Sequence, residues 1–96
     1  MKPSELLKAN RVAIRDIVAA HHALNPRVFG SVAHGNDTDE SDLDLLVDTT
    51  PDTSLLDIAK IQNRVQKLLG ISVDVLTPNS ISAKFRNSTI AEAVRV

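Results

Sequence analysis

The sequence contains no cysteine, no tryptophan and no tyrosine among its 96 residues. The absence of cysteine excludes a disulfide framework, a thiol nucleophile and thiolate metal sites, and it is compatible with a reducing cytoplasm, where we expect the protein to act. Two phenylalanines cannot provide the stacking platforms of single-stranded nucleic-acid binders, so we expect no direct binding to nucleic acid. No apolar run approaches the roughly 18–20 residues of a membrane span, and the N-terminus lacks the apolar middle of a secretory signal, so we expect no membrane association.

The short length of the chain limits what it can contain. A chain of this size buries roughly 60–70% of its unfolded surface, which is enough for one hydrophobic core. We therefore expect a single domain over residues 1–96. An enzyme this small has no room for a second domain that holds an acceptor substrate, so another molecule must present it.

The formal net charge of −1 conceals a segregation of charge along the chain. The segment 28–59 contains no lysine or arginine and has a charge of −8, whereas the rest of the chain has a charge of +7. The eight acids of this segment are Asp37, Asp39, Glu40, Asp42, Asp44, Asp48, Asp52 and Asp57. A block that acidic must be solvated, disordered or bound to cations.

Apolar spacing predicts alternating helices and strands. In chain order we expect a helix from Ser4 to Leu24, a strand at 27–29, a short helix at 32–34, a strand at 42–48, a helix from Thr53 or Ser54 to Gly70, a strand at 71–76 and a helix from about Ser80. The last helix is the least regular, because Asn87, Ser88 and Thr89 could break it. This order predicts an α/β fold, a small mixed β-sheet backed by helices, with a right-handed helical crossover between the last two strands.

The strand at 42–48 combines core residues with paired acids. Its alternation places Leu43, Leu45 and Val47 on one face, and Asp42 and Asp44 with Leu46 on the other. Like charges so placed repel each other unless a cation intervenes. The next strand contains a single acid, Asp74, on the face away from its apolar residues.

A second motif precedes the acids at a defined spacing. Gly30-Ser31 is followed after ten residues by Asp42-x-Asp44, and Asp74 follows the crossover helix. This pattern resembles the nucleotidyltransferase superfamily related to DNA polymerase beta. It is most similar to the minimal nucleotidyltransferases that act as antitoxins beside HEPN-domain toxins. The joint spacing is much harder to meet by chance than either motif alone.

The chemistry of nucleotidyl transfer explains these residue types. Mg²⁺ prefers oxygen ligands and usually takes one or two carboxylates together with substrate phosphates. We expect Asp42 and Asp44 to share two Mg²⁺ ions, and Asp74 to complete the second site and to orient or deprotonate the attacking hydroxyl. Gly30 permits close backbone approach to the triphosphate, and Ser31 offers its N–H and hydroxyl where a short helix begins.

The resemblance also implies an activity and a partner. It implies an Mg²⁺-dependent transfer of AMP from ATP to a tyrosine hydroxyl of a HEPN ribonuclease toxin, which the chain neutralises as an antitoxin in a hetero-oligomer. The chain has no tyrosine, so it cannot be its own tyrosine acceptor. One departure concerns His34, which stands where relatives often have arginine before the glycine equivalent to Gly35, and so removes a fixed cation.

Several other interpretations remain open. The chain could inhibit its partner by binding alone, or be the catalytic half of a two-protein enzyme that acts on a small molecule or a nucleic-acid end. The segment Asp37-x-Asp39-x-Ser41 begins like a calcium loop, but Asp42 occupies the position where the sharp turn needs glycine. Six acids are expected to be solvated bystanders, namely Asp37, Asp39, Glu40, Asp48, Asp52 and Asp57.

Overall fold

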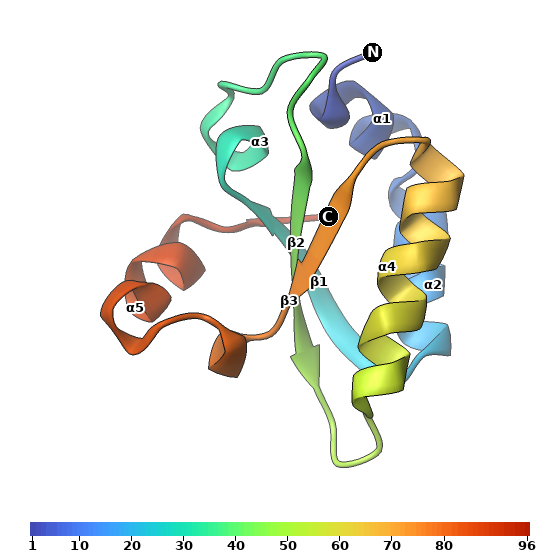
Figure 1. Cartoon of the computed structure of the whole chain (residues 1–96), viewed down its shortest axis with the longest axis vertical. Coiled ribbons are helices and arrows are strands. Elements are labelled where there is room, and N and C mark those ends of the chain that lie inside the picture. The colour runs from blue at the N-terminus through green and yellow to red at the C-terminus, as the bar shows by residue number, and fades with distance from the viewer.

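The computed structural model describes residues 1–96 and contains one four-stranded sheet with helices on both faces (Figure 1). The strands are β1 (Ala23–Phe29), β2 (Leu43–Thr49), β3 (Val73–Leu76) and β4 (Val94–Arg95). The helices are α1 (Pro3–Ala9), α2 (Arg11–Ala20), α3 (Ser31–His34), α4 (Leu55–Leu69) and α5 (Ala83–Glu92), with a 3-10 turn η1 (Pro78–Ser80). The predicted fold class, a small mixed sheet backed by helices, is confirmed.

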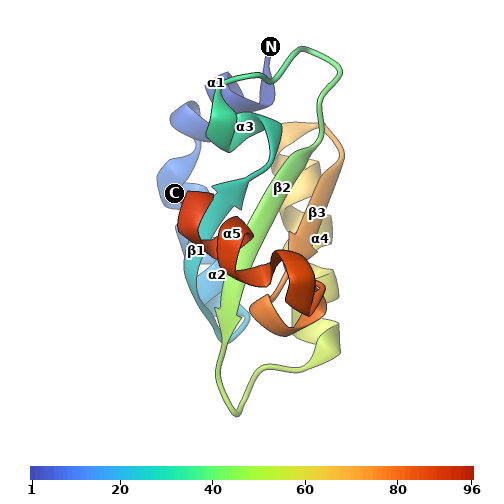
Figure 2. The same ribbon diagram turned by 90° about the vertical axis from the view of Figure 1, so that its left-hand side faces the viewer.

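The sheet has the strand order β3-β2-β1-β4. β1 is antiparallel to both β2 and β4, whereas β2 and β3 are parallel and are connected through α4. α2 and α4 cover one face of the sheet, and α5 lies over the other face (Figures 1 and 2). Because β2 and β3 run in the same direction, their first residues meet at one end of the sheet, close to the loop that arrives from α3 (Figure 2).

The core forms between the sheet and the α2/α4 layer, as the alternation in β2 predicts. Leu43, Leu45 and Val47 are completely buried there against apolar residues of both helices. Leu46 is also completely buried, but it lies outside this core cluster, on the face that α5 covers. The two faces of β2 therefore have different roles, since one builds the core and the other presents Asp44.

The ends of α4 agree with the predicted signals. Ser54 is the N-cap, in a capping box with Asp57, and Gly70 ends the helix with φ +70°. Apolar spacing predicts that this helix buries one stripe, formed by Leu55, Ile58, Ala59, Val65, Leu68 and Leu69, and this prediction is only partly correct. Ile61, Val65 and Leu69 pack in the core at four-residue spacing, whereas Leu55, Ala59 and Leu68 are exposed because they lie off this line.

The single helix predicted from Ser4 to Leu24 is wrong. The chain forms two helices separated at Asn10, whose side-chain amide donates to the Leu6 carbonyl at 2.8 Å. Such local side-chain bonds compete with a continuous helix.

After α2 the backbone turns at His22, with φ +62°, and β1 begins at Ala23. β1 is longer than the strand predicted at 27–29. A bulge between Leu24 and Arg27 accommodates Pro26, which was expected to precede the strand.

The C-terminal helix α5 also differs from expectation. It continues without a break through 87–89, and none of its residues is buried. The sequence predicts an apolar side that Ile81 and Phe85 begin and Ile90, Ala93 and Val94 continue. Phe85 is 55% exposed, so this apolar side does not form. The two-residue strand β4, too short to be predicted, pairs with the edge of β1.

None of the helices combines the length and the apolar character needed to cross a membrane.

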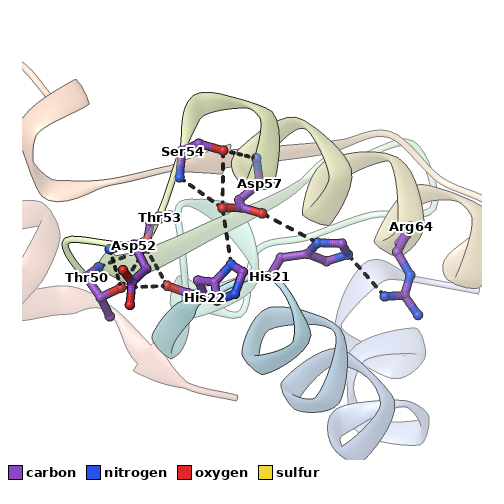
Figure 3. A network of polar contacts seen from close by, with 8 residues as sticks. All are labelled: His21, His22, Thr50, Asp52, Thr53, Ser54, Asp57 and Arg64. Atoms are coloured by element: carbon purple, nitrogen blue, oxygen red, sulfur yellow. Dashed lines mark hydrogen bonds and ion pairs between the residues drawn. The ribbon is translucent and has the colours of Figure 1, made fainter.

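A polar network connects the α2–β1 turn to the start of α4 (Figure 3). The Asp57 carboxylate accepts from the Ser54 backbone N–H at 2.9 Å and from His22 Nδ1 at 3.4 Å, and His21 Nδ1 lies 3.8 Å away. Arg64 Nη1 donates to His21 Nε2 at 3.1 Å, which leaves the His21 proton on the nitrogen that faces Asp57. The prediction that Asp57 is a solvated bystander is therefore wrong, because its carboxylate connects the α2–β1 turn to the start of α4.

Candidate active site

Asp44 and Asp74 lie side by side on neighbouring strands. They are register partners in the parallel β2–β3 pair, as are Leu43 with Val73 and Leu45 with Val75 on the core side. Adjacent strands are about 4.8 Å apart, so the two carboxylates share one face at the starting end of both strands. Sequence spacing alone could not show that a crossover of 23 residues, 50–72, would return Asp74 to this register.

The third predicted acid, Asp42, immediately precedes β2 and is exposed. It still acts on Asp44 through its charge. Burial raises the pKa of Asp44, and the carboxylates of Asp74 and then Asp42 raise it further. A carboxyl group with a raised pKa is electrostatically unfavourable when ionised, and a bound cation removes that penalty.

Gly30 packs directly against the Asp44 carboxylate. It follows Phe29, the β1 residue that pairs with Asp44, and it adopts φ +68° and ψ −145°. A Cβ atom at this position would lie 2.5 Å from Asp44 Oδ2, so only glycine fits. The chain leaves β1 here and begins α3 at Ser31, which brings the predicted phosphate-binding residues to the same end of the sheet as the acids.

The helix α3 matches the short helix predicted over 32–34, extended by one residue. Gly35 ends it in the left-handed conformation, and the Asn36 N–H donates to the Ser31 carbonyl at 2.9 Å. His34 Nε2 lies 3.2 Å from Glu92 Oε2, so this side-chain contact connects α3 to the end of α5.

Three acids predicted to be solvated are not free. Besides Asp57, Asp37 is buried in the loop between α3 and β2, and Asp48 pairs with Arg27, with Nη2 2.7 Å from Oδ1. Arg27 lies opposite Leu46 in the β1–β2 pair, on the face that presents Asp44. The pairing of Asp48 with Arg27 had a signal in the sequence, because two-residue alternation from Phe29 places Arg27 on the same face of the sheet as Asp48. No local signal predicted the burial of Asp37.

The other three acids that were predicted to be solvated, Asp39, Glu40 and Asp52, are exposed as predicted.

The donor set fits a divalent cation. Asp42, Asp44 and Asp74 are all oxygen donors, and their mutual repulsion raises the pKa of the central carboxyl. No three histidine or acidic side chains are close enough together to form a ready-made metal cluster. Magnesium sites that use one or two carboxylates complete their coordination with water and substrate phosphates, so this arrangement suits an ion that arrives with a nucleotide.

The only surface hollow in the structure lies elsewhere, at the junction of α1 and α2. It is lined by residues 8–13 with Arg15 and Asp16, and it contains none of the predicted site residues. At the candidate site itself, Asp42 and Asp74 are exposed and Asp44 is half-buried.

Paired strand acids beside a glycine-serine turn, on a small mixed sheet, define the class of enzymes that transfer nucleotides. The comparison with protein families agrees with this class. The family model described as "Nucleotidyltransferase domain" matches residues 14–96, and the chain belongs to this family.

Relatives of the chain indicate a subgroup within the family. A solved structure provisionally described as a minimal nucleotidyltransferase is 38% identical, with a TM-score of 0.87, and the match covers 97% of this chain and 95% of that chain. Protein adenylyltransferase MntA of Thermococcus cleftensis is 33% identical over 69 residues, which are 72% of this chain and 70% of that protein. A Methanocaldococcus jannaschii protein with the provisional name protein adenylyltransferase MJ0435 is 36% identical over 80 residues, 83% of this chain and 86% of that protein. The predicted resemblance to minimal nucleotidyltransferases is confirmed.

A more distant structure shares the fold. A crystal structure described as a toxin-antitoxin with AMP-PNP has a TM-score of 0.75 at 17% identity, and the match covers 90% of this chain and 71% of that chain.

Proposed function

We propose that this chain transfers AMP from ATP to a hydroxyl group of a partner toxin and thereby neutralises it as an antitoxin. The observation that carries the proposal is the register pairing of Asp44 with Asp74, with Gly30 packed against the Asp44 carboxylate. Relatives named protein adenylyltransferases support the type of reaction, and the AMP-PNP of the toxin-antitoxin structure supports a nucleoside triphosphate as the donor.

The reaction assigns a role to each site residue. The acceptor oxygen attacks the α-phosphorus, the bond from this phosphorus to the bridging oxygen breaks, and pyrophosphate leaves. Asp74 orients the hydroxyl and accepts its proton. Asp42 and Asp44 would hold Mg²⁺, with Asp74 at a second ion, and the bound metal neutralises charge on the triphosphate. Gly30 and Ser31 receive the triphosphate through the backbone N–H and the hydroxyl of Ser31.

The partner is proposed to be a HEPN-domain ribonuclease toxin, and the acceptor to be one of its tyrosines. Resemblance to the minimal nucleotidyltransferases supports this assignment, as does the toxin-antitoxin description of the fold relative. These 96 residues contain no tyrosine, so under this proposal the partner presents the hydroxyl in a hetero-oligomer.

Mass spectrometry of the partner tests the proposal. Incubation of the chain with Mg²⁺, ATP and the protein encoded beside it should add AMP to the partner. Asp42→Asn and Asp44→Asn should each abolish the adduct, whereas Asp39→Asn, which changes an exposed acid of the same loop, should leave it unchanged. Equal adduct formation by wild type and by both active-site variants would overturn the catalytic assignment.

Inhibition by binding alone is the second candidate function. Exposed Leu55 and Leu56 on α4 and Phe85 on α5 favour it, because such residues suit a protein interface. Under this alternative, Asp42→Asn and Asp44→Asn would still neutralise the toxin in cells. If the chain is instead half of an enzyme that acts on a small molecule or a nucleic-acid end, the partner would remain unmodified.

A further inference from the structure

Asp37 is the only buried polar or charged residue of the protein, with 7% of its surface exposed. Its Oδ2 atom accepts a hydrogen bond from the Ser4 backbone N–H at 2.8 Å. Burial alone would raise the pKa of Asp37, but hydrogen bonds from the Ser4 backbone and side chain and from its own N–H, together with the charge of Lys2, lower it instead. A buried ionised carboxylate is retained only where its hydrogen bonds compensate for lost hydration.

Asp37 occupies the loop that connects the two halves of the candidate site. α3 ends at Gly35, with the Asn36 N–H bonded to the Ser31 carbonyl. Beyond Asp37 comes an exposed turn over 38–41, in which the Thr38 N–H donates to Ser41 Oγ at 2.8 Å, and Asp42 follows directly. Between the end of α3 and the start of β2, the Asp37 side chain is therefore the only buried attachment of this loop to the rest of the protein.

The attachment is made by α1, the first helix of the chain. Ser4 belongs to the first turn of α1, whereas the family model begins at residue 14. A helix of seven residues is marginal by itself, and α1 is held in place by buried Pro3 and Leu7. The N-terminal helix thus gives the loop a support outside the sheet.

From these contacts we infer that Asp37 is a positioning residue, which docks the loop 36–41 on α1 and so holds Asp42 beside Asp44 for binding of the metal-nucleotide complex. The inference rests on the proposed function, because it assigns Asp42 to the metal. Without Asp37, only exposed turn bonds would restrain the loop. Binding of the metal-nucleotide complex would then have to order the loop first, which weakens affinity.

The experiment breaks the same hydrogen bond from both sides. Asp37→Ala removes the acceptor, Ser4→Pro removes the donor while proline remains compatible with a first helical turn, and Asp37→Asn keeps one acceptor oxygen. Asp39→Asn is the matched control, since it changes a neighbouring acid that makes only an exposed 4.0 Å contact with the N-terminus. Calorimetry measures the affinity of each folded variant for ATP with and without Mg²⁺, and hydrogen exchange reports on the amides of residues 36–42.

We expect Asp37→Ala and Ser4→Pro to weaken Mg²⁺-dependent ATP binding about tenfold, the lower end of the range for residues that orient metal ligands. Exchange at residues 36–42 should accelerate, Asp37→Asn should fall between these variants and wild type, and Asp39→Asn should match wild type. Raising the Mg²⁺ concentration should restore binding.

Two results would overturn the inference. One is wild-type Mg²⁺-dependent affinity in folded Asp37→Ala and Ser4→Pro, and the other is an equal loss of affinity with and without Mg²⁺. If Asp37→Ala does not fold, Ser4→Pro and Asp37→Asn provide the same comparison. Failure of wild type itself to bind ATP with Mg²⁺ would instead contradict the proposed function.

Discussion

The backbone of Gly30 and the carboxylate of Asp44 are in direct contact, so that a methyl group on Gly30 would lie 2.5 Å from Asp44 Oδ2. This contact couples the two motifs of the site, because the turn that presents Ser31 also restrains the carboxylate proposed to hold the metal. Glycine is therefore required at position 30 for two separate reasons, the positive φ angle and the absence of space for a Cβ atom.

Substitution of Gly30 by alanine should disrupt nucleotide binding. The new methyl group must displace the Asp44 side chain, so we expect the affinity for ATP with Mg²⁺ to fall at least tenfold, about 1.4 kcal/mol. Gly70→Ala controls for positive φ alone, because Gly70 has nearly the same φ, +70° against +68°, but ψ +23° instead of −145°, and nothing lies within 4 Å of its Cβ position. It should lose roughly 1–2 kcal/mol of stability and keep its affinity. Equal affinity losses in both variants would refute the contact argument.

Asp44→Asn should stabilise the folded protein while abolishing transfer. Burial and the neighbouring carboxylates raise the pKa of Asp44 above its ordinary value of 3.8, so the ionised side chain destabilises the native state. This penalty is absent below pH 3.8 and is fully present above the folded pKa. Urea unfolding should therefore show a gain of less than about 1 kcal/mol near neutral pH, because water screens the partly exposed side chain, and the gain should disappear on acidification through this range. A gain that is independent of pH would contradict the electrostatic cause.

Asp57 should affect stability in the opposite direction. The Ser54 backbone hydrogen bond, with the His22 contact, lowers the pKa of Asp57 from 3.8, so its ionised form stabilises the native state. That contribution is present above pH 3.8 and is lost as pH falls through the lower folded pKa. Asp57→Asn should be less stable than wild type near neutral pH, and thermal unfolding curves of the two proteins should converge in acid. A constant difference at every pH would indicate a packing effect.

His34→Arg tests the departure from the resemblance. Arginine would restore a fixed cation beside the phosphate-binding turn, and we expect it to tighten ATP binding about threefold, equivalent to roughly 0.7 kcal/mol. Calorimetry at low and high salt should show the gain shrinking as ionic strength rises. Glu92→Gln, which removes the partner of His34 without adding a cation, separates release of His34 from the new charge. An equal gain in Glu92→Gln would show that the contact of His34 with Glu92, and not the absence of an arginine at position 34, controls the affinity for ATP.

The parts of the structure that the sequence predicted are those encoded by local periodicity. Alternation in β2 separates the core leucines from Asp44, and Ser54 and Gly70 define both ends of α4. The grouping of Gly30, Asp44 and Asp74 was expected from spacing and resemblance, and the register of β2 with β3 places them together. Their roles in catalysis and metal binding remain predictions.

The features that escaped prediction depend on contacts between distant segments. Asp37 reads as one more acid of a solvated block, and only docking of α1 buries it against Ser4. The bulge that lets β1 extend before Arg27 is stabilised by pairing with β2, which overrides the local tendency of Asn25-Pro26 to end an element. Exposure of the α5 surface, in contrast, has a local signal, because this segment is polar and lacks a regular apolar stripe.

The most direct test of enzymatic neutralisation is a turnover measurement. The chain is mixed with a large molar excess of its partner, Mg²⁺ and ATP, and the modified fraction of the partner is followed by intact-mass spectrometry. Catalysis predicts that nearly all of the partner becomes modified with AMP and stays inactive after the chain is removed, and that Asp44→Asn produces no adduct. Neutralisation that stops at one partner per chain, requires the chain to remain bound and proceeds without any AMP adduct would contradict the account.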